Sequence, residues 1–131
     1  MGSTEARILV VEDELGLQRL IRRRAEQEQL EVMTALTIAD GLSLCRTGRP
    51  DLIVLDLHLP DGQGIEMLRR LKSDPQTAKI PIVAWSGSGD VSEEDDILLA
   101  GADAYCSKLD LRALFVTILE LLRRVAGVPG N

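Results

Sequence analysis

Short runs that are apolar at every position and end abruptly in acidic residues constrain the fold of this chain more than any other feature. Residues 8–11 (ILVV) are followed at once by Glu12 and Asp13, and residues 52–55 (LIVL) by Asp56. A strand covered on both faces of a parallel sheet is apolar at every position, whereas a strand with one exposed face alternates. The runs therefore predict a parallel sheet whose strands end in charge.

Longer segments with helical spacing alternate with these runs. Leu111, Leu114, Phe115 and Ile118, for example, fit one face of a closing helix. The patterns predict strands at residues 8–11, 31–36, 51–56, 80–85 and 104–107, separated by helices at 17–25, 37–44, 65–71, 91–100 and 111–125. Residues 60–64, with one proline and two glycines, are expected to form a loop. This order predicts an α/β protein of five β/α units with right-handed crossovers.

The length and charge of the chain limit its architecture and partners. Its 131 residues suit a single domain, expected over residues 7–125, with tails at 1–6 and 126–131, the second of which equally suits a truncated linker. Lys and Arg number 15 against 21 Asp and Glu, and no basic block occurs, so we expect no direct binding of nucleic acid. The apolar runs are far shorter than the roughly 20 residues that span a bilayer, so we expect no membrane association and a cytoplasmic location.

The two cysteines give no sign of a disulfide or a zinc site. Cys45 and Cys106 are far apart in the sequence and have no paired spacing. Because Cys45 lies within a helical pattern, we expect it to be a small packed apolar side chain and not a reactive thiol.

The carboxyl ends of the predicted strands carry the candidate functional residues. In an open parallel sheet ligands bind beyond these ends, and here the ends carry Glu12, Asp13, Asp56, Ser86 and Lys108. Carboxylates that converge in one crevice repel each other unless a cation compensates them. Oxygen ligands favour a hard ion, and a few carboxylates with phosphate oxygens suit Mg²⁺ better than Ca²⁺. Lys108 and the Ser86 hydroxyl would then hold oxygens of an incoming phosphoryl group.

Taken singly, these residues have ordinary explanations. An Asp at the end of a strand is commonly a turn former or a helix cap, and a Lys there is usually solvated. Ser86 lies in a Ser-Gly-Ser-Gly segment and by itself suits a plain loop residue. Their joint occurrence at the ends of four strands, in this order, is what favours a phosphoryl-transfer site.

With these residues in place, the chain resembles the receiver domain of bacterial two-component response regulators from about residue 7 to residue 125. The resemblance is carried by four blocks, VVEDE (10–14), DLIVLDLHLPDG (51–62), IVAWSG (82–87) and GADAYCSK (101–108). It implies a flavodoxin-like, doubly wound, five-stranded parallel sheet with the strand order 2-1-3-4-5.

The resemblance implies a role for each acidic residue. Asp56 would be the phosphoacceptor and a ligand of the cofactor Mg²⁺, which Asp13 would bind directly and Glu12 directly or through water. The third protein ligand would be the backbone carbonyl of His58, not its ring. The phosphoryl group would come from a phosphohistidine on a histidine kinase or a histidine phosphotransfer protein.

The resemblance also implies a conformational switch. Ser86 would be the switch hydroxyl, and Tyr105 the aromatic that rotates inward when Ser86 moves toward the phosphoryl group. From the residues alone, Tyr105 is equally a half-buried strand aromatic. His58 and Ser88 each lie two residues beyond a site residue and border the path of an attacking water, so we hypothesise that they influence the lifetime of the phosphate. The alternative for His58 is an exposed loop histidine without function.

One position departs from the pattern of the family. Proline usually follows the conserved lysine, commonly after a cis peptide bond, whereas this chain has Leu109 after Lys108. A cis bond before a non-proline residue costs about 2.5–4 kcal/mol, against about 0.5–1 kcal/mol before proline. We therefore expect either a trans bond with an altered loop or a strained cis bond held by its surroundings.

A protein of this family is a signalling switch and not an enzyme in the usual sense, although it assists its own phosphorylation and dephosphorylation. The acyl phosphate on Asp56 would bias an equilibrium between two conformations through new contacts to Ser86 and Lys108. By analogy with the family, the output surface covers about residues 91–124 and controls a downstream protein or an output domain. The sequence leaves open whether the chain is a monomer or a weak dimer.

Other classes of protein share this fold. A pseudo-receiver is a binding module that works without phosphorylation; the complete set of site residues argues against it, while Leu109 leaves room for it. A phosphatase of the aspartyl-phosphate type needs a second acid two residues after its nucleophile, where this chain has His58. A flavin- or nucleotide-binding protein needs a phosphate-binding loop after the first strand, where Glu12, Asp13 and Glu14 repel phosphate.

Overall fold

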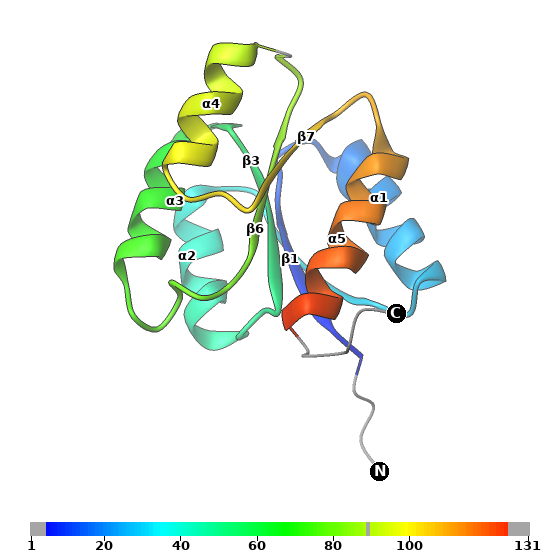
Figure 1. Cartoon of the computed structure of the whole chain (residues 1–131). Helices are drawn as coiled ribbons and strands as arrows, with labels where there is room; N and C mark the ends of the chain where they lie inside the picture. The colour runs from blue at the N-terminus through cyan, green and yellow to red at the C-terminus, as the bar shows by residue number, and fades with distance from the viewer. Residues whose placement is uncertain (1–4, 89, 126–131) are drawn as a thin grey trace.

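A five-stranded parallel sheet forms the central layer in the computed structural model of the chain, which describes residues 5–88 and 90–125. Its strands are β1 (Arg7–Val11), β2 (Glu31–Ala35), β3 (Leu52–Asp56), β6 (Ile82–Ser86) and β7 (Ala104–Ser107), and they lie in the order β2-β1-β3-β6-β7 (Figure 1). This is the predicted order 2-1-3-4-5, so the predicted fold class is confirmed. Most of the two predicted tails, at 1–4 and 126–131, lies outside the described residues.

Helices cover both faces of the sheet, as the apolar runs predicted. Helices α1 (Leu15–Gln27) and α5 (Leu111–Val125) lie on one face, and α2 (Ile38–Thr47), α3 (Gly64–Ser73) and α4 (Val91–Leu99) lie on the other (Figure 1). Neighbouring positions of one strand therefore enter different cores: Leu9 packs in the core under α2 and α3, and Val10 in the core under α1 and α5. Every residue of β3 is buried.

Most element boundaries differ from the predicted ones by one to three residues, and two of these differences have a clear physical cause. Helix α2 continues past residue 44 to Thr47, because Cys45 extends its buried face and the helix ends only where the Gly48 N–H bonds the Leu44 carbonyl. Strand β6 begins at Ile82, two residues after the predicted start, because Pro81 has no N–H to donate to a neighbouring strand.

The segment 60–64 was predicted to be a loop, and this prediction is wrong in part. Strands β4 (His58–Leu59) and β5 (Gly62–Gln63) form a short antiparallel hairpin, and α3 begins at Gly64. Gly62 has a φ of 152°, which a side chain would strain, so its glycine allows the tight turn. The hairpin directly follows the end of β3 and encloses one side of the candidate site.

The structure bears on two further predictions, one about the cysteines and one about membrane-spanning helices. Cys45 and Cys106 are both free and buried, which confirms Cys45 as a packed apolar side chain. Within residues 5–88 and 90–125, every helix is too short or too polar to cross a lipid bilayer.

Candidate functional site

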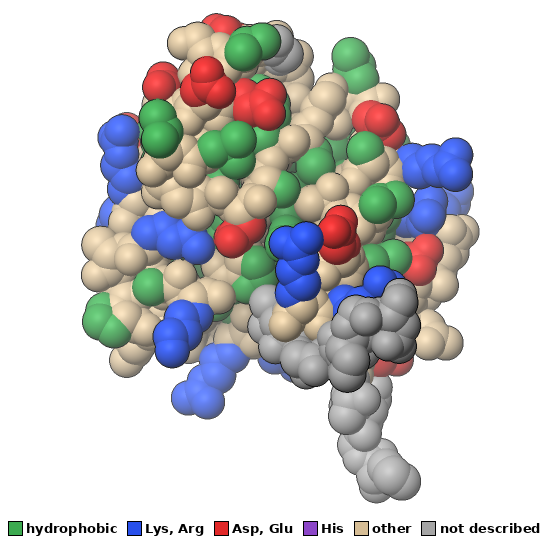
Figure 2. Space-filling view, viewed as in Figure 1, with side chains coloured by type: hydrophobic (Ala, Val, Ile, Leu, Met, Phe, Trp, Pro, Cys, Tyr) green, Lys and Arg blue, Asp and Glu red, His purple; other side chains and the backbone are tan. Residues whose placement is uncertain are grey.

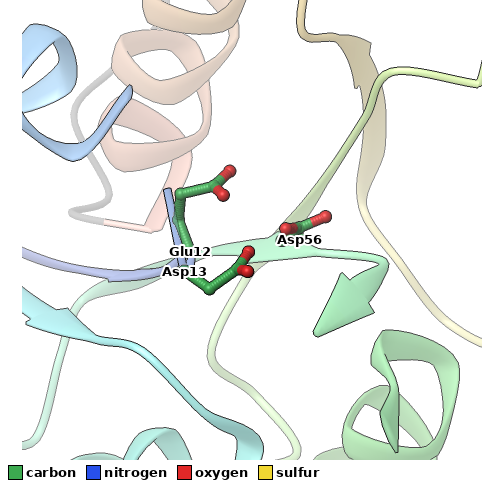
Figure 3. Close-up of side chains that lie close together, drawn as sticks. All are labelled: Glu12, Asp13 and Asp56. Atoms are coloured by element: carbon green, nitrogen blue, oxygen red, sulfur yellow. The ribbon is translucent and has the colours of Figure 1, made fainter. Parts of the chain in front are cut away.

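Three carboxylates meet at the carboxyl edge of the sheet. Strands β1 and β3 are neighbours, with Val11 opposite Leu55, so the acids that follow β1 lie beside the acid that ends β3. One oxygen from each of Glu12, Asp13 and Asp56 lies within 4.8 Å of the others, and Figure 3 shows the three side chains turned toward a common point. Glu12 and Asp56 are 0% and 2% exposed, whereas Asp13 is open to solvent.

Lys108 joins this cluster from the end of β7. Its Nζ lies 2.8 Å from Oε1 of Glu12 and 3.1 Å from Oδ2 of Asp56. Burial alone would lower the pKa of Lys108, but its hydrogen bonds to the two carboxylates hold the pKa above the ordinary value. The ammonium therefore stays charged between them.

The two buried carboxyls differ in how well the fold stabilises their charge. Burial raises the pKa of Asp56, and the charge of Glu12 raises it further, against the opposing hydrogen bonds from the His58 N–H and Lys108. Burial would also raise the pKa of Glu12, but hydrogen bonds from Lys108, Glu14 and Trp85 lower it below the ordinary value. The fold thus stabilises the charge of Glu12 more than it stabilises the charge of Asp56.

The donor set of the cluster suits a hard divalent cation. Three carboxylates and one ammonium leave two negative charges without a partner. Every side-chain ligand in the cluster offers oxygen, and the most exposed member, Asp13, leaves the site open to solvent on one side. Oxygen donors, a small number of carboxylates and room for water are the features that Mg²⁺ favours.

Glu12 has a hydrogen-bond donor on each of its side-chain oxygens. The Trp85 indole N–H donates to Oε1 across 3.0 Å, and the backbone N–H of Glu14 donates to Oε2 across 3.0 Å. The Gln18 side chain donates to the Glu12 carbonyl across 2.6 Å. Sequence analysis missed Trp85 and Gln18; the signal for Trp85 was its place next to Ser86 in a buried strand, where an indole N–H needs a polar partner.

Ser86 and Tyr105 meet at a residue that sequence analysis also missed. The Ser86 hydroxyl, 1% exposed, donates to Oε1 of Glu93 across 2.8 Å, and the Tyr105 hydroxyl donates to the same oxygen across 2.9 Å. Glu93 lies in the first turn of α4. Among the described residues, the hydrogen bonds of the Ser86 side chain are to Glu93 and to the N–H of Ser88, so it is not bonded to Asp56.

His58 links the phosphoacceptor candidate to the same α4 residue. Its backbone N–H donates to Oδ1 of Asp56 across 3.1 Å. Its ring, 55% exposed, lies 3.2 Å from Oε1 of Gln63 and 3.2 Å from Oε2 of Glu93. The ring is thus held at the rim of the site, and its influence on phosphate lifetime stays a prediction.

The departure at Leu109 has a simple structural form. Among the described residues no peptide bond is cis, so the Lys108–Leu109 bond is trans, the first of the two expected forms. The N–H of Leu109 bonds Oγ of Ser107 across 3.1 Å, and the Leu109 side chain points into solvent. Lys108 reaches the carboxylates with this trans bond.

The sequence of this chain is similar to those of known proteins. A family model described as "Response regulator receiver domain" matches residues 8–119. The chain is 42% identical over 101 residues to the KDP operon transcriptional regulatory protein KdpE of Escherichia coli (strain K12), an alignment that covers 77% of this chain and 44% of that protein. It is 38% identical over 119 residues to the phosphate regulon transcriptional regulatory protein PhoB of Rhizobium meliloti (strain 1021), covering 90% of this chain and 52% of that protein.

A solved structure agrees with these matches. The response regulator receiver domain protein (CheY-like) from Methanospirillum hungatei JF-1 has a TM-score of 0.86 at 28% sequence identity, and the superposition covers 96% of this chain and 100% of that chain. The chain spans about half the length of the two transcriptional regulators. It belongs to the response regulator receiver domain family, a family of signalling domains.

Proposed function

We propose that Asp56 accepts a phosphoryl group from a phosphohistidine on a histidine kinase or a histidine phosphotransfer protein, with Mg²⁺ bound by the acidic cluster. One observation carries the proposal: Asp56 is buried at a strand end and shares its cluster with Glu12, Asp13 and Lys108. The cluster carries excess negative charge, and a divalent cation bound there would offset both this charge and that of an incoming phosphoryl group.

The reaction needs little covalent chemistry from the chain. An oxygen of Asp56 attacks phosphorus, a P–O bond forms as the P–N bond of the phosphohistidine breaks, and the partner's imidazole leaves with the electron pair. Lys108, 3.1 Å from Asp56, would hold one phosphoryl oxygen. The His58 N–H on Oδ1 orients the attacking carboxylate.

The acidic cluster would hold the metal. Asp13 and Asp56 are its proposed side-chain ligands, and Glu12 would bind directly or through water. The backbone carbonyl of His58 would complete the protein set. When bound, Mg²⁺ neutralises charge on the phosphoryl oxygens during transfer.

The proposed response to phosphorylation is a change at α4, β7 and α5, within residues 91–124, that a downstream protein or an output domain detects. Acidic side chains gather over α4 on the face shown in Figure 2, and Val91 and Leu99 are 71% and 87% exposed beside them. A surface of exposed apolar and acidic side chains suits a protein partner. The relatives are named as transcriptional regulators. For this chain, the proposed output is control of a partner protein or of an attached domain.

A phosphodonor assay tests the proposal. The protein is incubated with acetyl phosphate and Mg²⁺, and its intact mass is measured with time. We expect one added phosphoryl group in the wild type, and none in Asp56→Asn or after the metal is removed with EDTA. A wild type that gains no Asp56-dependent adduct would instead favour a pseudo-receiver, which binds partners without phosphorylation.

A further inference from the structure

The carboxylate of Glu93 collects four polar side chains from three different segments. Its Oε1 accepts hydrogen bonds from the hydroxyls of Ser86, Ser88 and Tyr105, at 2.8, 2.8 and 2.9 Å. Its Oε2 lies 3.2 Å from Nε2 of His58. The four partners come from the end of β6 and the loop after it, from β7 and from the β4–β5 hairpin, so one side chain joins α4 to the rim of the site.

The position of Glu93 in its helix makes this arrangement unexpected. Glu93 lies three residues after the helix cap Asp90, where a glutamate commonly bonds back to the N–H of the cap residue. Here the Asp90 N–H bonds Oγ of Ser88 instead, across 3.2 Å. The Glu93 side chain is therefore turned toward the sheet, where it is 21% exposed.

Glu93 remains an anion in this setting. Burial alone would raise its pKa, but the hydrogen bonds from Ser88, Ser86 and Tyr105 outweigh burial and lower the pKa below the ordinary value. A charged acceptor forms stronger hydrogen bonds with hydroxyls than a neutral one.

The Ser86 hydroxyl cannot serve two acceptors. A serine hydroxyl carries a single hydrogen to donate, and that of Ser86 points at Glu93. A phosphoryl oxygen on Asp56 needs the same hydrogen. Glu93 and the phosphoryl group therefore compete for the Ser86 hydrogen, and Glu93 also accepts the hydroxyl of Tyr105.

We propose that Glu93 is a positioning residue that holds Ser86 and Tyr105 in the unphosphorylated arrangement and so opposes uptake of the phosphoryl group. The inference rests on the proposed role of Asp56. When the Ser86 hydrogen moves to the phosphoryl group, α4 loses its bond to the end of β6, and on that side only the Ser88 hydroxyl still holds Glu93. The response of α4 to phosphorylation thus begins at Glu93.

The inference is tested with the phosphoryl analogue beryllofluoride in the presence of Mg²⁺. The beryllofluoride concentration at half-saturation is measured by fluorine NMR for the wild type, Glu93→Ala and Glu93→Gln. Because a hydrogen bond to a charged acceptor contributes roughly a factor of ten in an equilibrium, we expect a half-saturation concentration about tenfold lower in Glu93→Ala than in the wild type. Glu93→Gln keeps a neutral acceptor and should show a smaller decrease in the same direction.

Two controls separate the hydrogen bonds from simple loss of negative charge. Glu94→Ala removes the same charge from the next position of α4, where the side chain makes no hydrogen bond or ion pair with any residue that the structure describes. This variant should leave half-saturation within about twofold of the wild type. In a Ser86→Ala/Tyr105→Phe background, Glu93→Ala should have no further effect. The inference about Glu93 would be overturned if the tenfold effect persisted in that background, or if Glu93→Ala left the half-saturation concentration unchanged. A wild type that fails to bind beryllofluoride would instead contradict the role of Asp56.

Discussion

The indole N–H of Trp85 donates a hydrogen bond to Oε1 of Glu12 across 3.0 Å, so the one tryptophan of the chain is bonded directly to the acidic cluster. Trp85 is 1% exposed and lies in β6, one residue before Ser86. Its emission should therefore respond to charge at the metal site.

Binding of Mg²⁺ should change the fluorescence of Trp85. A cation beside Glu12 alters the field at the indole, so we expect a saturable change in emission during a Mg²⁺ titration. Asp13→Asn, which removes a proposed ligand without touching Trp85, should weaken the apparent affinity by about tenfold or more. Emission that stays constant while calorimetry detects Mg²⁺ binding would place the metal elsewhere.

Replacing Lys108 with Met should destabilise the metal-free protein. The substitution leaves Glu12 and Asp56 buried without their cation, and breaking a buried ion pair in this way costs about 3–5 kcal/mol. Protonation of Asp56, whose pKa is already raised by burial, offsets part of this cost. We therefore expect the free energy of unfolding, measured in urea, to fall by about 3 kcal/mol.

Mg²⁺ should then stabilise Lys108→Met more than it stabilises the wild type, because the ion supplies the charge that the lysine no longer does. Lys79→Met is the matched control: Lys79 is exposed and has no ion pair among the described residues, so its loss should change stability by no more than about 0.5 kcal/mol. Equal Mg²⁺ effects in the wild type and Lys108→Met would show that lysine and metal do not share one site.

Gly64→Ala should distort the end of β3. A Cβ at Gly64 would collide with the carbonyl oxygen of Asp56 and with Cα of Leu57, which are both backbone atoms and cannot easily move. Overpacking of this kind costs about 1–3 kcal/mol, and we expect the free energy of unfolding, measured in urea, to fall by this amount. We also expect slower phosphorylation by acetyl phosphate. Gly16→Ala, at the start of α1, meets only an ordinary contact at 3.8 Å and should be neutral or stabilising. Equal stability of the two variants would contradict the close approach at Gly64.

Both cysteines should resist alkylation in the folded protein. Burial raises the pKa of the Cys45 thiol to about 11 and also raises that of Cys106, so neither forms the reactive thiolate at pH 8. Because the folded pKa of Cys45 lies above its ordinary 9.0, its contribution to stability is complete below pH 9 and is lost as the pH rises toward 11. Intact mass after iodoacetamide at pH 8 should show no adduct on the native protein and two on the urea-unfolded one; rapid native labelling would contradict the burial of these thiols.

Much of the fold followed from local pattern. Uniformly apolar runs identified the strands, and the face of Leu114, Phe115 and Ile118 identified the closing helix, because burial on both sides of a sheet leaves a signal in the sequence itself. The hairpin at 58–63 was not predicted, because proline and glycine indicate a turn but do not reveal that the flanking residues pair.

The site was predictable only where its residues end strands. Glu12 and Asp13 follow β1, Asp56 is the last residue of β3 and Lys108 follows β7. The topology brings these strand ends together. Glu93 lies within a helix, at a spacing from Asp90 that predicts a capping role, so its partners emerge only once β6, β7 and α4 are packed.

The phosphoacceptor role of Asp56 is tested most directly by locating the phosphoryl group. The wild type is phosphorylated with acetyl phosphate and Mg²⁺, treated with borohydride, which reduces an aspartyl phosphate to homoserine, and digested with trypsin. Residues 47–69 form one tryptic peptide that contains Asp51, Asp56 and Asp61, which fragmentation distinguishes. We predict homoserine at position 56 alone. The role assigned to Asp56 would be contradicted by modification at Asp13, Asp51 or Asp61 in its place. It would also be contradicted if protein that has gained phosphate yielded this peptide unmodified.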